Sequence, residues 1–152
     1  MRKALILIIA IIFSATINGQ TKDEIHSILE EYSKNYGKPN YGQEFVNTKL
    51  NPAILKVEEL VCEENDIEFM SGFLEMLLKT KGVNNEVAIN SLGGIFICNS
   101  EIIYKYYEQI YPDKYLREIL KVGFENKTAD RIDEIDNYIF LRKRLNHLVK
   151  TK

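Results

Sequence analysis

The chain has 152 residues, 45% of them hydrophobic and 28% charged, with a formal net charge of −2. This length suits one domain with an ordinary hydrophobic core, and the composition excludes a disordered or collagen-like chain. Without Arg2 and Lys3, 18 basic residues face 22 acidic residues. Because nucleic acids are bound by clustered Lys and Arg, and here acids are interleaved with them except near the C-terminal end, we expect no nucleic-acid partner.

Residues 1–19 have the pattern of a secretory signal peptide. Arg2 and Lys3 precede an apolar run over 4–13, and a short stretch of small and polar residues follows. The apolar run is near half of the ~20 residues that a transmembrane helix needs, although an imperfect cleavage site leaves a retained anchor as the alternative. We therefore expect an exported protein, periplasmic or extracellular, with no membrane anchor after cleavage and one helical domain over 20–152.

The first half of the domain shows clear helix boundaries. Thr21 followed by Glu24 is a capping-box pattern, and apolar side chains then recur at helical spacing, which predicts a helix over 22–35. Glycine and proline end this helix and predict a loop over 36–42. An Asn-Pro pair fits the first positions of a second helix, which we expect over 51–65.

The middle of the domain is strongly apolar. A third helix begins after Asp66 and carries apolar side chains on most of its surface. After a turn at 82–85, apolar spacing supports a fourth helix, interrupted by Gly93 and Gly94. The run 95–98 fits a short buried strand as well, because periodicity does not separate the two for short apolar runs.

The last part predicts three further helices. The pair Asn99-Ser100 caps a fifth helix that ends at Tyr111, because Pro112 breaks it. A sixth helix follows at once, and Thr128 then caps a seventh. The apolar stripe of this last helix consists of Ile132, Ile135, Ile139, Leu145 and Leu148.

The order of these elements defines the fold class. No hairpin signal lies between alternating strands in residues 20–152. We therefore predict an all-α fold: a single compact helical domain of about six to seven short antiparallel helices, as a helical bundle or a short helical-hairpin array, after the signal peptide.

Two cysteines, Cys62 and Cys98, lie in the expected mature chain. Export permits a disulfide between them, which would close a loop of about 36 residues and add roughly 3 to 4 kcal/mol in the chain-entropy model. The alternative is two buried free thiols, each packing as a small apolar residue.

Motifs of catalysis are absent from the sequence, which has no phosphate-binding glycine loop, nucleophile elbow or His-Glu-x-x-His. We therefore assign no catalytic residue, cofactor or metal. The nearest alternative is a small-ligand binder or hydrolase whose site is built from acidic and tyrosine residues, with His26, Glu59 and Glu63 as its groups. That alternative requires the first two helices to converge on a cleft.

Tyrosines are the most suggestive feature for binding. Tyr104 and Tyr106 belong to a run of five tyrosines within twelve residues, and Tyr36 and Tyr41 flank the glycine- and proline-containing loop. Tyrosine combines a large apolar face with a polar tip, which suits protein contact, although packing on one face of the fifth helix is the preferred explanation for Tyr104. Our leading hypothesis is an exported, non-enzymatic module that binds an unknown protein partner, either inhibitor- or immunity-like or an envelope scaffold.

Overall fold

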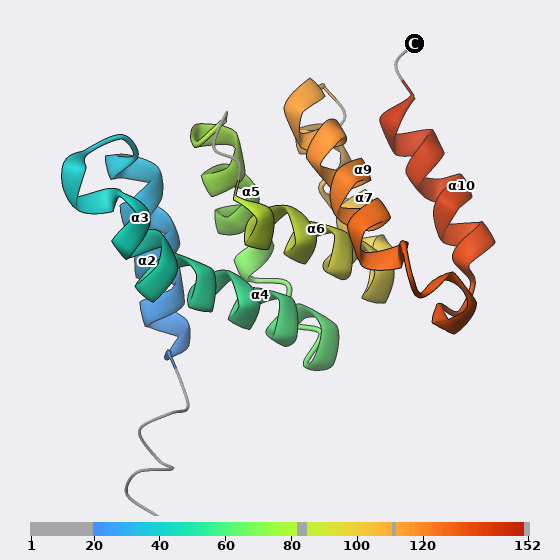
Figure 1. Ribbon diagram of the computed structural model, residues 1–152, viewed down its shortest axis with the longest axis horizontal. Helices are drawn as coiled ribbons and strands as arrows, with labels where there is room; N and C mark the ends of the chain where they lie inside the picture. The colour runs from blue at the N-terminus through green and yellow to red at the C-terminus, as the bar shows by residue number, and fades with distance from the viewer. Residues whose placement is uncertain (1–19, 82–84, 111, 151–152) are drawn as a thin grey trace, which may run out of the picture.

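The computed structural model describes residues 20–81, 85–110 and 112–150 and is all-α in these ranges (Figure 1). The run 95–98 is helical, which decides against the strand alternative. The expected signal peptide, 1–19, lies outside the described residues. Within the described part of the chain, no helix is long and apolar enough to cross a bilayer.

Eight helices, α2 and α4 to α10, make up most of the described residues. They are α2 (Lys22–Asn35), α4 (Asn51–Glu63), α5 (Phe69–Lys79), α6 (Glu86–Cys98), α7 (Ser100–Lys105), α8 (Tyr107–Ile110), α9 (Lys114–Thr128) and α10 (Tyr138–Val149). The other helical segments are η1 (Pro39–Tyr41), α3 (Gln43–Phe45), η2 (Val46–Leu50) and η3 (Ile132–Glu134), of which η2 is a turn of π-helix.

Local capping explains why several helices begin where the sequence predicts. Thr21 and Glu24 form the complete capping box at the start of α2. The side chains of Asn85 and Asn99 accept from backbone N–H groups at the starts of α6 and α7. Asn51 does not act as a cap, because the backbone is already helical through η2 and continues directly into α4.

The helices follow one another across the molecule roughly in chain order (Figure 1). α2 and α5 run side by side, and Lys22 at the start of α2 forms an ion pair with Asp66 in the segment before α5. α6 packs against α4 on one side and α9 on the other. The largest fully buried side chains come from all of these helices and include Ile25, Leu29, Ile54, Phe69, Phe73, Leu92, Phe96 and Phe124.

Two glycines allow α6 and α9 to cross with their backbones in contact. A Cβ built on Gly93 would lie 2.1 Å from the carbonyl carbon of Gly123, closer than the 3.0 Å that real Cβ atoms keep. Gly94 leaves room for the ion pair between Glu58 of α4 and Lys127 of α9, whose atoms lie 2.9 Å apart. The expected interruption of α6 at these glycines is therefore wrong: the helix continues, and the glycines serve its packing.

A disulfide joins the C-terminal ends of α4 and α6. Cys62 and Cys98 are bonded, and their Cα atoms lie 5.6 Å apart. Beside the bridge, the Asn99 side-chain amide donates to the Asn65 side-chain oxygen at 2.8 Å. The disulfide alternative is confirmed, and the two cysteines are not free thiols.

The C-terminal third differs from the prediction in two places. The fifth predicted helix is divided at Tyr106 into α7 and α8, and its expected end at Tyr111 lies outside the described residues. Thr128 is the last residue of α9 rather than the cap of a long final helix. The chain then forms η3 and a left-handed turn at Asn137 (φ 59°) before α10 begins. The long final helix is thus wrong, and α10 covers only its second half.

Candidate functional site

Four aromatic rings pack on one another where the chain turns after α2. Gly37 has a left-handed backbone (φ 85°), which lets the chain reverse after Tyr36 toward η1 and α3. The ring centroid of Tyr32 lies 5.9 Å from those of Tyr36 and Phe45, and the Tyr41 centroid lies 4.9 Å from that of Phe45. We refer to Tyr32, Tyr36, Tyr41 and Phe45 as the tyrosine cluster.

The cluster has a buried base and an accessible surface. Tyr32 is 2% exposed, whereas Tyr36 is 43% exposed and both Tyr41 and Phe45 are half-buried. The Tyr41 hydroxyl donates to a Glu31 carboxylate oxygen at 2.6 Å, and this hydrogen bond raises the pKa of Tyr41 above its ordinary value. Burial raises the pKa of Tyr32. Because each ring rests on another, the cluster presents ring faces and a hydroxyl in fixed positions.

The other two tyrosines predicted for binding lie elsewhere. Tyr104 is half-buried in α7, where the Arg144 guanidinium carbon lies 4.3 Å from its ring centroid and its hydroxyl donates to the Arg144 carbonyl oxygen at 3.3 Å. Tyr106 is half-buried at the end of α7. Figure 1 shows α5 and α6 between α7 and the end of the molecule that carries α3. The structure therefore brings Tyr36 and Tyr41 together but separates them from Tyr104 and Tyr106.

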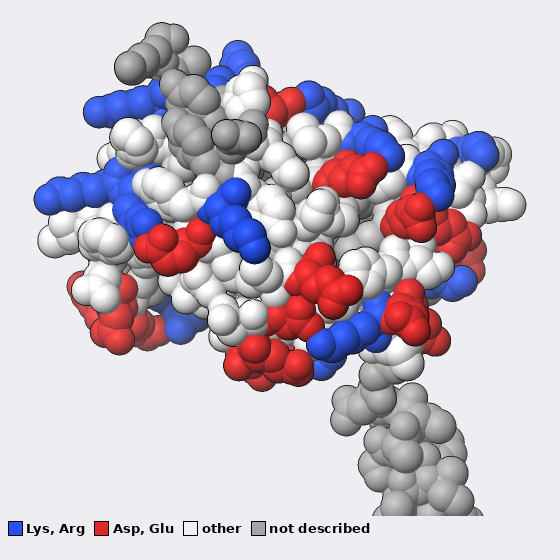
Figure 2. Space-filling view, turned by 180° about the vertical axis from the view of Figure 1, so that it is seen from behind, with Lys and Arg blue, Asp and Glu red and all other residues white. Residues whose placement is uncertain are grey.

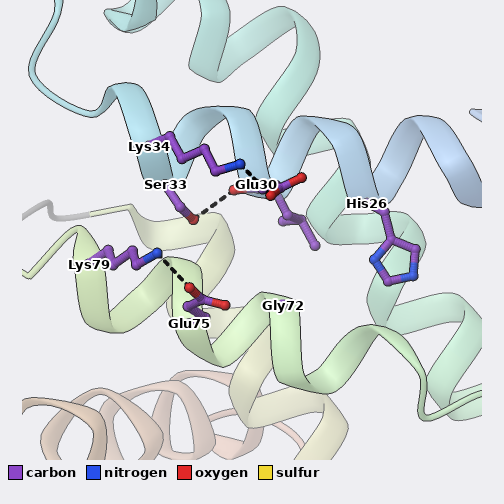
Figure 3. A pocket seen from close by; sticks show the side chains of 8 residues that line it. His26, Glu30, Ser33, Lys34, Gly72, Glu75 and Lys79 are labelled. Atoms are coloured by element: carbon purple, nitrogen blue, oxygen red, sulfur yellow. Dashed lines mark hydrogen bonds and ion pairs between the residues drawn. The ribbon is translucent and has the colours of Figure 1, made fainter.

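A hollow of about 210 Å³ lies between α2 and α5 (Figure 3). At one end the His26 ring stacks on Phe69, with centroids 4.5 Å apart, and His26 Nε2 lies 3.6 Å from a carboxylate oxygen of Glu68. Gly72 lines the middle of the hollow without a side chain. Two ion pairs at 2.5 Å, each within one helix, line the other end: Glu30 with Lys34 and Glu75 with Lys79.

Glu59 and Glu63, the acidic residues of α4 that the sequence groups with His26, do not line this hollow. Glu59 pairs with Lys56 on its own helix, and Glu63 is exposed at the end of α4. Across the residues that the structure describes, no three His, Cys, Asp or Glu side chains converge as metal ligands.

An exposed apolar surface on α10 is the feature that sequence reasoning missed. Ile132, Ile139 and Phe140 are 46%, 72% and 54% exposed, and they line a hollow of about 580 Å³ between η3 and α10. Ile139 and Leu145 are six positions apart in the sequence, which places them about 120° apart around a helix of 3.6 residues per turn. This angular separation can be read from the sequence. It indicates that Ile139 does not lie on the same helix face as the buried Leu145.

No known protein-family model, curated protein or solved structure matches the chain. Seen from behind, the molecule carries acidic and basic side chains interspersed over much of its face (Figure 2). Recognition on that face therefore depends on local groups rather than on an extended field of one sign.

Proposed function

We propose that this chain is an exported protein that binds another protein through the tyrosine cluster. The observation that carries the proposal is the ordered set of accessible rings, with Tyr36 exposed and Tyr41 and Phe45 half-buried, on the buried base of Tyr32. Aromatic residues supply much of the binding energy at protein interfaces, and rings already held in place lose little conformational entropy on binding.

Charged side chains surround the tyrosine cluster, as they do at the polar rim of a protein interface. Lys49 Nζ lies 5.6 Å from the Phe45 ring centroid, and Glu31 holds the Tyr41 hydroxyl. A specific interface buries about 800 Å² on each partner, so the cluster would form the centre and the flanking charges of α2 and η2 the edge. This arrangement suits an inhibitor- or immunity-like protein or an envelope scaffold.

Two features support export. A disulfide such as Cys62–Cys98 persists in oxidising compartments and is reduced in the cytosol. Residues 1–19 carry the charge and hydropathy pattern of a signal peptide. Detection of the chain outside the inner membrane, with a new N-terminus near residue 20, would test this part of the proposal.

The binding proposal is tested with purified protein and cell-envelope extract. The parent protein captures a partner that is identified by mass spectrometry and then purified for isothermal titration calorimetry. We expect the double variant Tyr36→Ala, Tyr41→Ala to lose at least tenfold in affinity. The matched control is Tyr106→Ala, which removes the same kind of side chain outside the cluster. Equal affinity of parent and double variant, with both folded by circular dichroism, would refute the cluster as the binding surface.

A small-ligand site in the hollow beside His26 is the second candidate. The stacked imidazole and the two ion pairs supply polar groups there, but about 210 Å³ is below the ~300–1,000 Å³ of most ligand pockets. Changes in the His26 ring resonances during NMR titration with small polar ligands would favour it over the protein-binding proposal.

A further inference from the structure

The outer face of α10 exposes apolar side chains although its inner face is fully packed. Leu141, Leu145 and Leu148 are buried against the rest of the domain. On the other side, Ile139 is 72% exposed and Phe140 is 54% exposed. Large exposed apolar groups that cluster around a hollow mark an interaction surface, whereas single scattered ones do not.

The position of α10 is fixed by polar contacts as well as by its leucines. Arg144 Nη1 donates to Ser100 Oγ at 2.8 Å and to a Glu101 carboxylate oxygen at 2.5 Å. At the helix start, Tyr138 stacks on Phe124 with centroids 5.8 Å apart. The exposure of Ile139 is therefore not the result of a loosely placed helix, and α10 offers a stable platform.

Charges of opposite sign lie on either side of this apolar surface. Asp130 and Asp133 precede it in the chain, and Lys143 and Lys150 follow it; all four are exposed. No ion pair among the described residues involves any of these four. In Figure 2 the α10 end lies on the left, where basic side chains gather above and acidic side chains below. The sequence of charge along this surface is acidic, apolar, basic.

We propose that the surface binds a second copy of this chain in an antiparallel, two-fold arrangement of α10. If the two-fold axis passes near Ile139 and Phe140, the apolar groups of the two copies meet at the axis. The acidic segment of each copy then faces the basic end of the other, since a two-fold axis exchanges positions before and after it. The charge pattern is therefore self-complementary, which favours a second copy over an unrelated partner. The proposal is independent of the tyrosine cluster, which lies at the other end of the molecule (Figure 1).

The size of the surface sets the strength of the dimer. A 12-residue helix is about 18 Å long, so α10 and η3 together bury less than a stable dimer interface of ~800 Å² per partner. We expect a reversible dimer with a dissociation constant on the order of tens of micromolar, weakened by salt. Analytical ultracentrifugation of the exported protein from about 5 to 500 μM covers this range.

Charge reversal tests whether the acidic segment of one copy meets the basic end of the other. Variant A carries Asp130→Lys and Asp133→Lys, and variant B carries Lys143→Glu and Lys150→Glu. Each variant alone places like charges opposite one another, so we expect its dimerisation to weaken at least tenfold. An equimolar mixture of A and B restores both attractive contacts, and we expect it to dimerise about as strongly as the parent. A contact that does not pair the acidic segment of one copy with the basic end of the other would not be restored in this way.

Variants of apolar residues complete the test. Ile139→Ser should weaken dimerisation at least tenfold, whereas Leu55→Ser, a change of another exposed residue (54%) on α4, should not. Circular dichroism verifies that each variant is folded. A parent that remains monomeric at 500 μM, or a mixture of A and B that dimerises no better than A or B alone, would overturn the proposal. Dimerisation that Tyr36→Ala weakens while Ile139→Ser does not would place the contact on the tyrosine cluster instead.

Discussion

Substitution of Gly93 by alanine tests whether the close crossing of α6 and α9 holds the fold together. In an open helix, Gly→Ala stabilises by about 1 kcal/mol because alanine has the higher helix propensity. At Gly93 the new Cβ would lie 2.1 Å from the carbonyl carbon and 2.5 Å from the next backbone nitrogen of α9. Since these are backbone atoms, no side-chain rotation relieves the overlap, and the two helices must move apart.

The expected change in the free energy of unfolding follows from these two opposing effects. Overpacking in a well-packed core costs about 1–3 kcal/mol and occasionally more, and a rigid backbone neighbour places Gly93→Ala at the upper end. After the gain in helix propensity, we expect a net loss of about 2 kcal/mol. Gly94→Ala is the matched control, because its Cβ would meet the movable carboxylate of Glu58. The carboxylate can rotate aside, and the gain in helix propensity offsets the weakening of its ion pair with Lys127.

Urea unfolding followed by far-UV circular dichroism measures both variants. With a slope of about 1–3 kcal/mol per molar urea, a loss of about 2 kcal/mol lowers the midpoint by roughly 1 M for Gly93→Ala. The midpoint of Gly94→Ala should stay near that of the parent. If Gly93→Ala is as stable as the parent, or no less stable than Gly94→Ala, the inferred backbone contact between α6 and α9 is refuted.

Four further predictions address the disulfide, the last helix, a carboxylate and a buried hydroxyl. Replacing Cys62 and Cys98 by alanine should lower the free energy of unfolding, measured with urea, by about 3–4 kcal/mol. Dithiothreitol should destabilise the parent but not this double variant. Arg144→Met should lower the hydrogen-exchange protection of α10 amides about tenfold while leaving α2 unchanged, since the guanidinium joins α10 to α7. A hydrogen bond from a lysine of α2, aided by a backbone N–H, holds the pKa of Asp66 below its ordinary 3.8. The stabilisation by this carboxylate is therefore complete above about pH 4 and lost as the pH falls through the lowered pKa, so parent and Asp66→Asn should converge in stability at acid pH but differ at neutral pH. Ser91→Ala should raise stability by about 1 kcal/mol, because Ser91 Oγ is buried and has no hydrogen-bond partner among the described residues; an unchanged urea midpoint would contradict this.

Much of the tyrosine cluster is visible in the sequence, but not all of it. The glycine and proline after α2 predict the turn that carries Tyr36 and Tyr41. The contribution of Phe45, and the role of Tyr32 as the buried base, depend on how α3 folds back onto α2. Tyr104 shows the reverse case, because its contact with Arg144 joins residues 40 positions apart that no local pattern relates.

The sequence by itself determined the all-α class, the start of α2 at its capping box and the start of α7 at its asparagine cap. These features depend on hydrogen bonds between residues a few positions apart, so neighbouring residues are sufficient to specify them. Only the tertiary structure decided that Gly93 lies where α6 crosses α9 and does not interrupt its helix. The same holds for the bond between Cys62 and Cys98 and for the outward orientation of Ile139. Each of these depends on which distant segment arrives at the residue, and that is set by the packing of the whole core rather than by local periodicity.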